Sequence, residues 1–232
     1  MMLEIGYNHS FEIRKETILL PTNAKISIAF LSDFHFNKFS TTTINSIVAE
    51  LEKLNPSIIL LGGDYVDSEI GLSNLNIFLS KLHSFKNVFA IAGNHDYFFG
   101  IDKINQLFAK HTITWLQNNS AQICVDDVSV LISNNVLETC NKVDVTKILL
   151  LHKPIVSKHI SANFNLVFAG HLHGCQFVFW KNKNGLYPGK LFYKNNFMKF
   201  ENENCTYFNT KGLGDTLPIR FNCKKNFIFI SN

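Results

Sequence analysis

The chain has 232 residues, of which 46% are apolar and 17% are charged, and its formal net charge is +4 at pH 7. This composition predicts a folded globular chain with ample material for a core and without the strong charge imbalance of a disordered tail. The longest apolar stretches, SIILLGG and KILLLH, are far shorter than the roughly 20 residues that cross a bilayer, and no secretory leader opens the sequence. We therefore expect a cytoplasmic protein whose membrane contact, if any, is peripheral.

The cysteines follow neither a disulfide nor a zinc-cluster pattern. Their number is odd, and no C-x-x-C pair occurs among them. We expect reduced thiols at Cys124, Cys140, Cys175, Cys205 and Cys223.

The first half of the chain alternates strands with helices. Residues 25–32 (KISIAFLS) predict a buried strand, and a helix capped by Ser40 or Thr41 runs until Pro56 ends it. Further strands are predicted at SIILLGG and NVFAIAG, with an amphipathic helix between them whose apolar positions run from Leu72 to Phe85. This rhythm is typical of parallel strands with helices outside.

The pattern changes after a predicted helix at 101–110. AQICV, a DD turn and VSVLIS predict a hairpin, and TKILLLH and NLVFAGHLHG predict two more apolar strands. CQFVFW, KLFY, CTYFN and KNFIFIS are predicted to continue as short β segments. We expect one domain over residues 1–232, with two sheets packed face to face and helices on the outside.

Polar side chains follow five of the predicted strands, at the point where each strand ends. Ligands of open α/β sheets bind beyond the carboxyl ends of the strands, so these loops can converge on one site. The residues are Asp33 and His35, then Asp64 and Asp67, then Asn94, His95 and Asp96, then His152, and finally His171 and His173.

Each of these pairs alone also fits a capped turn with a hydrogen-bonded histidine. The joint pattern argues for a cation, because converging carboxylates and imidazoles without one would leave charges unpaired near the core. Oxygen and imidazole ligands without thiolate suit two divalent metals, manganese, iron, zinc or cobalt, of which we favour manganese. The histidines outside the pattern receive no role: His9, His83, His111 and His159.

The ordered motifs DFH, GDYVD, GNHD, the histidine of LLLHKP and GHLH resemble those of the calcineurin-like metallophosphoesterase superfamily over about residues 25–175. The resemblance implies a four-layer α/β/β/α sandwich of two mixed sheets with a dinuclear site. It implies one metal held by Asp33, His35, Asp64 and His173, and another held by Asp64, Asn94, His152 and His171. Asp64 would then bridge the two metals.

The resemblance leaves His95 free of metal and beside the scissile phosphate, where it stabilises phosphoryl charge or protonates the departing oxygen. Asp67 matches the carboxylate that orients this histidine. Asn94 is expected to aim its amide at the phosphate as well as bind metal, and Asp96 to support the ligands or to be structural.

The tail GLGDTLPIRFNC (212–223) resembles that of a bacterial subfamily that includes UDP-2,3-diacylglucosamine pyrophosphatases of lipid A synthesis. Arg220 in this tail is a candidate phosphate or carboxylate clamp, or else a surface ion pair. Two positions depart from the family: Ser68 replaces the arginine of protein phosphatases, which weakens a phosphoprotein substrate, and Cys175 replaces a glycine after the metal histidines.

Lysines alternate with aromatic residues in the stretch 180–200. A solvated hairpin with one apolar face is the favoured interpretation, and a surface for an anionic substrate or a lipid headgroup is the alternative. We expect no obligate protein partner, and the small charge argues against nucleic acid.

These features together predict a dinuclear-metal phosphoesterase in which a metal-bridging hydroxide attacks phosphorus in line. The resemblance favours a phosphodiester or pyrophosphate substrate over a phosphomonoester. One such substrate is the lipid-linked UDP-2,3-diacylglucosamine. A nuclease of the same fold and a non-catalytic scaffold are the alternatives.

Overall fold

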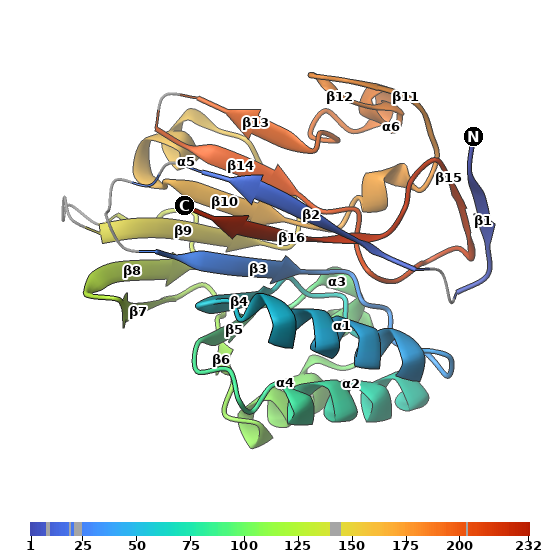
Figure 1. Ribbon diagram of the computed structural model, residues 1–232, viewed down its shortest axis with the longest axis horizontal. Coiled ribbons are helices and arrows are strands. Elements are labelled where there is room, and N and C mark those ends of the chain that lie inside the picture. The colour runs from blue at the N-terminus through green and yellow to red at the C-terminus, as the bar shows by residue number, and fades with distance from the viewer. Residues whose placement is uncertain (8–9, 19, 21–24, 140–144, 203) are drawn as a thin grey trace.

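Two six-stranded mixed sheets form the centre of the molecule (Figure 1). The computed structural model describes residues 1–7, 10–18, 20, 25–139, 145–202 and 204–232, so His9 and Cys140 lie outside the described residues. The first sheet has the order β2 (Glu12–Thr17), β16 (Asn226–Ser231), β3 (Ser27–Leu31), β4 (Ile58–Leu61), β5 (Val88–Ala90) and β6 (Thr114–Trp115). The second has the order β13 (Lys199–Glu201), β14 (Thr206–Asn209), β10 (Leu166–Ala169), β9 (Val145–Leu151), β8 (Val128–Ser133) and β7 (Ser120–Val125).

Two small antiparallel pairs and the helices surround these sheets. The pairs are β1 (Leu3–Ile5) with β15 (Ile219–Phe221), and β11 (Val178–Asn182) with β12 (Gly185–Pro188). The helices are α1 (Thr41–Leu54), α2 (Glu69–Lys81), α3 (Asn94–Phe99), α4 (Ile101–Lys110), α5 (Lys158–Asn163) and α6 (Gly189–Phe192). Among the described residues, no helix combines the length and apolar character needed to cross a membrane.

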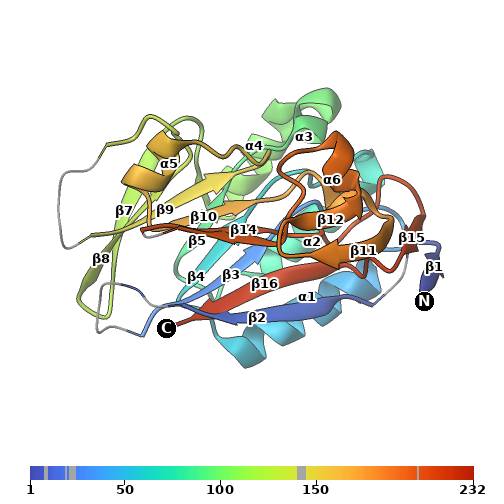
Figure 2. The ribbon, with the colours of Figure 1, turned by 90° about the horizontal axis from the view of Figure 1, so that it is seen from above.

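Strand β3 shows how alternation builds the layers. Ile28 and Phe30 belong to the core between the two sheets, whereas Ala29 and Leu31 belong to the core under α1, α2 and α4. On the far side, α5 and Phe197 cover the second sheet with a thinner apolar cluster. Figure 2 looks onto this upper layer, with α5 at one end and α6 at the other. The predicted α/β/β/α arrangement of two mixed sheets is confirmed.

The parallel strands determine where the site lies. Strands β3, β4 and β5 are parallel to one another, as are β9 and β10, so within each sheet their following loops leave from the same edge. Side-chain hydrogen bonds then join the loops of one sheet to those of the other, as described below.

Most predicted elements are present. Helix α1 ends at Leu54, with Asn55 at φ 45° before Pro56, and the 101–110 helix and the β7–β8 hairpin are confirmed. Helix α2 ends at Lys81 rather than near Phe85.

The predicted strand KLFY is wrong, because this segment forms the single helical turn α6. Pro188 has helical dihedrals (φ −81°, ψ −9°), and the Tyr193 amide donates to the Gly189 carbonyl at 2.9 Å. Leu191 and Phe192 are both exposed instead of alternating between buried and exposed positions.

Several elements were missed, among them β1, β2, β13, β15, α3 and α5. Strand β2 (EIRKET) lies at an edge of its sheet, where charged side chains are tolerated, so it lacks the apolar alternation by which strands are recognised.

Replacement of an aromatic side chain in the core between the two sheets should destabilise the folded protein. Phe168 is fully buried, with its ring centroid 5.2 Å from that of Phe30 and 5.5 Å from that of Phe208. We expect Phe168→Ala to lower the free energy of unfolding by about 3–5 kcal/mol in urea titrations, because it leaves a cavity. Phe192→Ala, whose ring is exposed, is the control and should change it by less than about 0.5 kcal/mol. Equal losses would contradict this layer assignment.

Candidate metal centre

The loops that follow β3, β4, β5, β9 and β10 meet at one place. The His171 amide, after β10, donates to Asp33 Oδ1, after β3, at 2.8 Å. The His95 amide, after β5, donates to Asp64 Oδ1, after β4, at 2.8 Å. The predicted polar strand ends of both sheets are therefore brought together.

Five of these residues have a left-handed backbone. Positive φ is uncommon outside glycine and costs conformational energy, so such residues cluster where function requires a particular side-chain direction. The φ values are 55° at Asp33, 42° at His35, 55° at Asp64, 70° at His171 and 49° at His173.

One group of candidate ligand atoms lies on the Asp33 side. His35 Nε2 and His173 Nε2 are 3.2 Å apart, and His35 Nε2 lies 3.8 Å from Asp64 Oδ2. Asp33 Oδ1 lies 3.9 Å from His173 Nε2, while Asp33 Oδ2 is buried and has no hydrogen-bond partner among the described residues. A buried carboxylate oxygen without a donor fits a cation at this position.

A second group surrounds His152. Its Nδ1–H donates to the Gly62 carbonyl at 2.9 Å, which leaves Nε2 to face Asp64 Oδ2 at 3.3 Å and Asn94 Oδ1 at 2.9 Å. His171 Nδ1 lies 3.2 Å from the same Nε2. Asp64 Oδ2 is thus shared by both groups, as a bridging carboxylate would be.

The electrostatics of the site shift the pKa values of two neighbouring histidines in opposite directions. Burial lowers the pKa of His152, but the hydrogen bond to Asp64 and the charge of Asp33 outweigh it and raise that pKa to about 9. Burial, together with the charge of His152, lowers the pKa of His171 to about 4. Buried carboxylates with imidazoles of this kind form a donor set that fits two divalent cations.

Asp67 contacts two histidines. Its Oδ1 accepts from His95 Nδ1 at 2.6 Å and its Oδ2 accepts from His35 Nδ1 at 2.7 Å. The contact with His95 matches the expectation. The contact with His35 was missed; it leaves His35 Nε2 to face the first group. Burial lowers the pKa of His35, but the hydrogen bond and charge of Asp67 raise it by more.

Asp96 joins two loops through their backbones. It is fully buried and accepts from the amides of Asp64, Tyr65 and Gly93 at 2.7–2.9 Å. Burial raises its pKa to about 6, even though these amides oppose the shift. Of its two expected roles, the contacts support that of holding the backbone of Asp64.

The tail holds the Asp33 loop from the other side. The Leu213 and Gly214 amides donate to the Asp33 carbonyl at 3.2 and 2.6 Å. A Cβ on Gly214 would lie 2.0 Å from the Phe34 carbonyl oxygen, so only glycine fits there.

Arg220 is not at the surface, so the expected surface ion pair is wrong. Its side chain is buried, and Nε binds Asp215 Oδ1 at 2.5 Å. Nη2 donates to the Gly214 carbonyl at 2.8 Å and lies 3.3 Å from His173 Nδ1. Lys225 binds the other Asp215 oxygen at 2.6 Å. Arg220 therefore clamps a carboxylate of the chain itself, behind the metal histidine.

The remaining singled-out residues lie near the site or apart from it. Ser68 caps α2 by accepting from the Gly71 amide at 3.2 Å. Cys175 has φ 58° and ends a 3₁₀ turn, so the loop keeps a glycine-like conformation without the glycine. His83, His111 and His159 hydrogen-bond to neighbours outside the site.

A hollow of about 530 Å³ opens beside His35, Asp67 and His95. Its walls are partly apolar and include Tyr7, Phe36, Phe39, Ile70 and Lys38.

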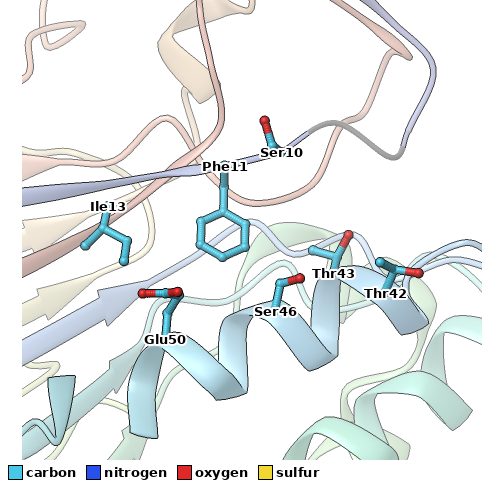
Figure 3. A pocket seen from close by; sticks show the side chains of 7 residues that line it. All are labelled: Ser10, Phe11, Ile13, Thr42, Thr43, Ser46 and Glu50. Atoms are coloured by element: carbon cyan, nitrogen blue, oxygen red, sulfur yellow. The ribbon is translucent and has the colours of Figure 1, made fainter. Parts of the chain in front are cut away.

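A larger hollow of about 630 Å³ lies between β2 and α1, with Phe11 on the strand side and Thr43 and Ser46 on the helix side (Figure 3). Its lining has no basic side chain, and its one acid, Glu50, binds Lys53. Among the described residues it therefore offers a phosphate hydroxyl groups but no cation.

Residues 26–175 match the family model of the calcineurin-like phosphoesterases. The chain belongs to this family. It is thus a metallophosphoesterase by class, in agreement with the motifs and with the clustered aspartate and histidine side chains.

Similar curated proteins are known mainly as metallophosphoesterases. An uncharacterized metallophosphoesterase of Aquifex aeolicus is 29% identical over 68% of this chain and 67% of its own. Phosphodiesterase YaeI of Escherichia coli is 29% identical over 74% of this chain and 72% of its own. The match to a Campylobacter jejuni metallophosphoesterase, at 27% identity, covers 71% of this chain, which spans about half (49%) of that relative.

Solved structures show the same fold. A dimetal phosphatase from Danio rerio superposes with a TM-score of 0.51 at 9% identity, over 83% of this chain and 89% of that one. The NAD nucleotidase of Haemophilus influenzae superposes with a TM-score of 0.50 at 14% identity. The superposition covers 82% of this chain and 46% of that one.

Metal should stabilise the folded chain, because it compensates the buried carboxylates. We expect Mn²⁺ added to chelator-treated protein to raise the melting temperature by several degrees, and Asp64→Ala to abolish this rise. Asp102→Ala, at an exposed site on α4, is the control and should keep it. If Mn²⁺ raised the melting temperature of Asp64→Ala as much as that of the parent, the assignment of Asp64 as a metal ligand would be contradicted.

Removing the buried guanidinium should cost stability. We expect Arg220→Met to lower the free energy of unfolding by about 3 kcal/mol or more, because it leaves Asp215 buried with only Lys225. The control is Lys53→Met, which breaks an exposed pair with Glu50 and should cost less than about 1 kcal/mol. Similar losses in the two variants would show that the Arg220 network contributes little.

Proposed function

We propose that the chain hydrolyses a phosphodiester bond at this centre. The observation that carries the proposal is the convergence of the candidate ligand atoms around Asp64, with His95 hydrogen-bonded to Asp67 at the edge of the adjoining hollow. The proposed ligands are Asp33, His35, Asp64 and His173 for one cation, and Asp64, Asn94, His152 and His171 for the other. Cations bound there would supply Lewis-acid polarisation of the phosphoryl oxygens and activation of water.

His95 supplies the proton that the departing oxygen needs. Its side chain is 29% exposed, less buried than His35, and its Nδ1 faces Asp67, so its Nε2 is directed away from that carboxylate. A carboxylate at Nδ1 fixes the orientation of the ring. The Asn94 amide lies beside the cluster and is placed to donate to a phosphoryl oxygen.

The adjoining hollow supports a diester over a monoester. Its 530 Å³ exceeds what a bare phosphate needs, and its apolar wall, with Phe39 and Ile70, suits an alcohol group with apolar surface. Lys38 at the same wall offers a cation for a further anionic group. The E. coli relative YaeI is named a phosphodiesterase, which agrees with this choice.

Several specific substrates and two alternative functions are compatible with this centre. A UDP-linked diacylglucosamine fits a hollow with apolar walls and a lysine, but none of the relatives above carries the name of a lipid A enzyme. A nuclease would use the same centre, and a scaffold would need neither the metals nor His95.

A substrate panel with Mn²⁺ tests the proposal. It comprises bis-p-nitrophenyl phosphate, p-nitrophenyl phosphate, single-stranded DNA and UDP-2,3-diacylglucosamine. We expect turnover of the diester to exceed that of the monoester, and Asp64→Ala to abolish both. No turnover of any compound would contradict catalysis and favour the scaffold, and preferred cleavage of DNA would favour the nuclease.

His95 should matter most when the leaving group is poor. We expect His95→Asn to lower kcat by about 100-fold or more for a diester with an alkyl leaving group, and by much less for the p-nitrophenyl diester, whose leaving group needs no proton. His159→Asn, an exposed histidine on α5, is the matched control. Equal losses for both diesters would contradict proton donation by His95.

A further inference from the structure

A cluster of exposed apolar side chains and lysines lies on the β11–β12 hairpin and α6. Phe192, Leu191 and Phe179 expose 78%, 70% and 61% of their surface. We name this cluster the lysine–aromatic patch; it consists of Phe179, Trp180, Lys181, Lys183, Leu191 and Phe192.

The patch lies outside the two large sheets, on a hairpin that contributes only Val178 and Leu186 to a small buried apolar cluster with Cys223. Strands β11 and β12 pair only with each other, apart from one isolated bridge between Phe177 and Phe221. Four of the five residues of β11 are exposed, so side chains on both of its faces meet solvent. Figure 1 shows the hairpin at the upper right, above the strands of the two large sheets. The favoured solvated hairpin with one apolar face is therefore present. Phe179 and Trp180 remain more than half exposed, although their rings contact those of Phe221 and Tyr187.

Charge is distributed unevenly along the chain around this patch. Residues 145–200 contain eight lysines and no aspartate or glutamate, whereas the rest of the chain carries 14 basic and 18 acidic residues. Lys181, Lys183 and Lys194 are exposed and form no ion pair with a described carboxylate. The patch therefore presents uncompensated positive charge beside its aromatic rings.

A second segment of the same character adjoins the patch. The loop after β9 exposes Ile155 and Val156 next to Lys153. The Asn195 side chain, just after α6, donates to the Pro154 carbonyl at 2.9 Å, which holds this loop against the α6 segment.

We propose that the lysine–aromatic patch docks on the surface of an anionic lipid membrane. Aromatic and aliphatic tips enter the boundary between headgroups and acyl chains, and flanking ammonium groups bind anionic headgroups. A protein partner is less favoured by this composition, because lysine is depleted in protein–protein interfaces whereas aromatic residues are enriched there.

Docking would bring the metal centre to the membrane surface. The turn that carries His173 precedes β11. The Asn196 side chain donates to Cys175 Sγ at 3.4 Å and to the Leu186 carbonyl of β12 at 3.1 Å, which joins the hairpin to that turn. A phosphate ester in the headgroup region would then be near the centre. This last consequence rests on the proposed function, but the docking itself does not.

Cosedimentation with vesicles tests the proposal. The full chain is mixed with vesicles of phosphatidylcholine alone, or of phosphatidylcholine with phosphatidylglycerol, at low salt. We expect binding to the anionic vesicles, which salt weakens, and little binding to the neutral ones. Because no turnover is measured, failure of this experiment is distinct from failure of the proposed hydrolysis.

Matched variants locate the binding surface. We expect Lys181→Glu/Lys183→Glu, and separately Leu191→Ser/Phe192→Ser, to weaken binding to anionic vesicles by roughly tenfold or more. The controls are Lys81→Glu/Lys86→Glu and Leu137→Ser, which change exposed residues elsewhere and should bind like the parent. All variants should keep the parent's unfolding midpoint and its activity on a soluble diester.

Two results would overturn the proposal. One is that the parent chain does not sediment with anionic vesicles, or that patch and control variants lose binding equally. The other is that the parent is a dimer in solution which Leu191→Ser/Phe192→Ser converts to a monomer, because the patch would then be covered by a second copy.

Discussion

The burial of two carboxylates at the junction of the sheets is the constraint on which the rest of the site depends. Asp33 and Asp64 are 0% and 2% exposed, yet Asp33 Oδ2 has no donor among the described residues. Burial of an uncompensated carboxylate is expensive, and the neighbouring imidazoles offset it only when they are protonated. Divalent cations satisfy the same oxygens and leave the imidazoles neutral, as ligands must be.

Hydrogen bonds from several loops and from the C-terminal tail hold the two carboxylates in place. The amides of His95 and His171 fix one oxygen of each carboxylate, and Asp96 fixes the backbone of Asp64. The tail fixes the Asp33 carbonyl through Leu213 and Gly214. These contacts also maintain the left-handed backbone at the ligand positions, which would otherwise relax to a lower-energy conformation. The C-terminal segment thus supports the candidate metal centre although it contributes no candidate ligand.

The sequence predicted the ends of the apolar strands and the polar residues that follow them, because parallel strands bring their carboxyl ends to one edge. It therefore predicted that the candidate ligands and the Asp67–His95 pair would lie close together, and the described side chains do so. It did not predict the second contact of Asp67, with His35, because that contact joins two distant loops. It did not predict the burial of Arg220, because the tail that holds Arg220 and Asp215 is buried by packing against the distant His173 turn. Strand β2 and helix α6 were missed for a local reason: charges on an edge strand and one turn of helix after Pro188 produce no clear periodicity. The lysine–aromatic patch was visible as a pattern, but only the exposure of its rings distinguishes an uncovered surface from a hairpin that packs on a core.

The most direct test of the account is a crystal structure grown with Mn²⁺, with anomalous scattering used to locate the metal. We expect two metal peaks, about 3.5–4 Å apart, on either side of Asp64. His35 and His173 should lie beside one peak, and His152 and His171 beside the other. The ligand atoms of His35, Asp67 and His95 also lie within 4.8 Å of one another and so provide an internal alternative. A single peak at Asp67 and His95, or no peak beside Asp64, would contradict the dinuclear centre and with it the assignment of His95 to proton donation.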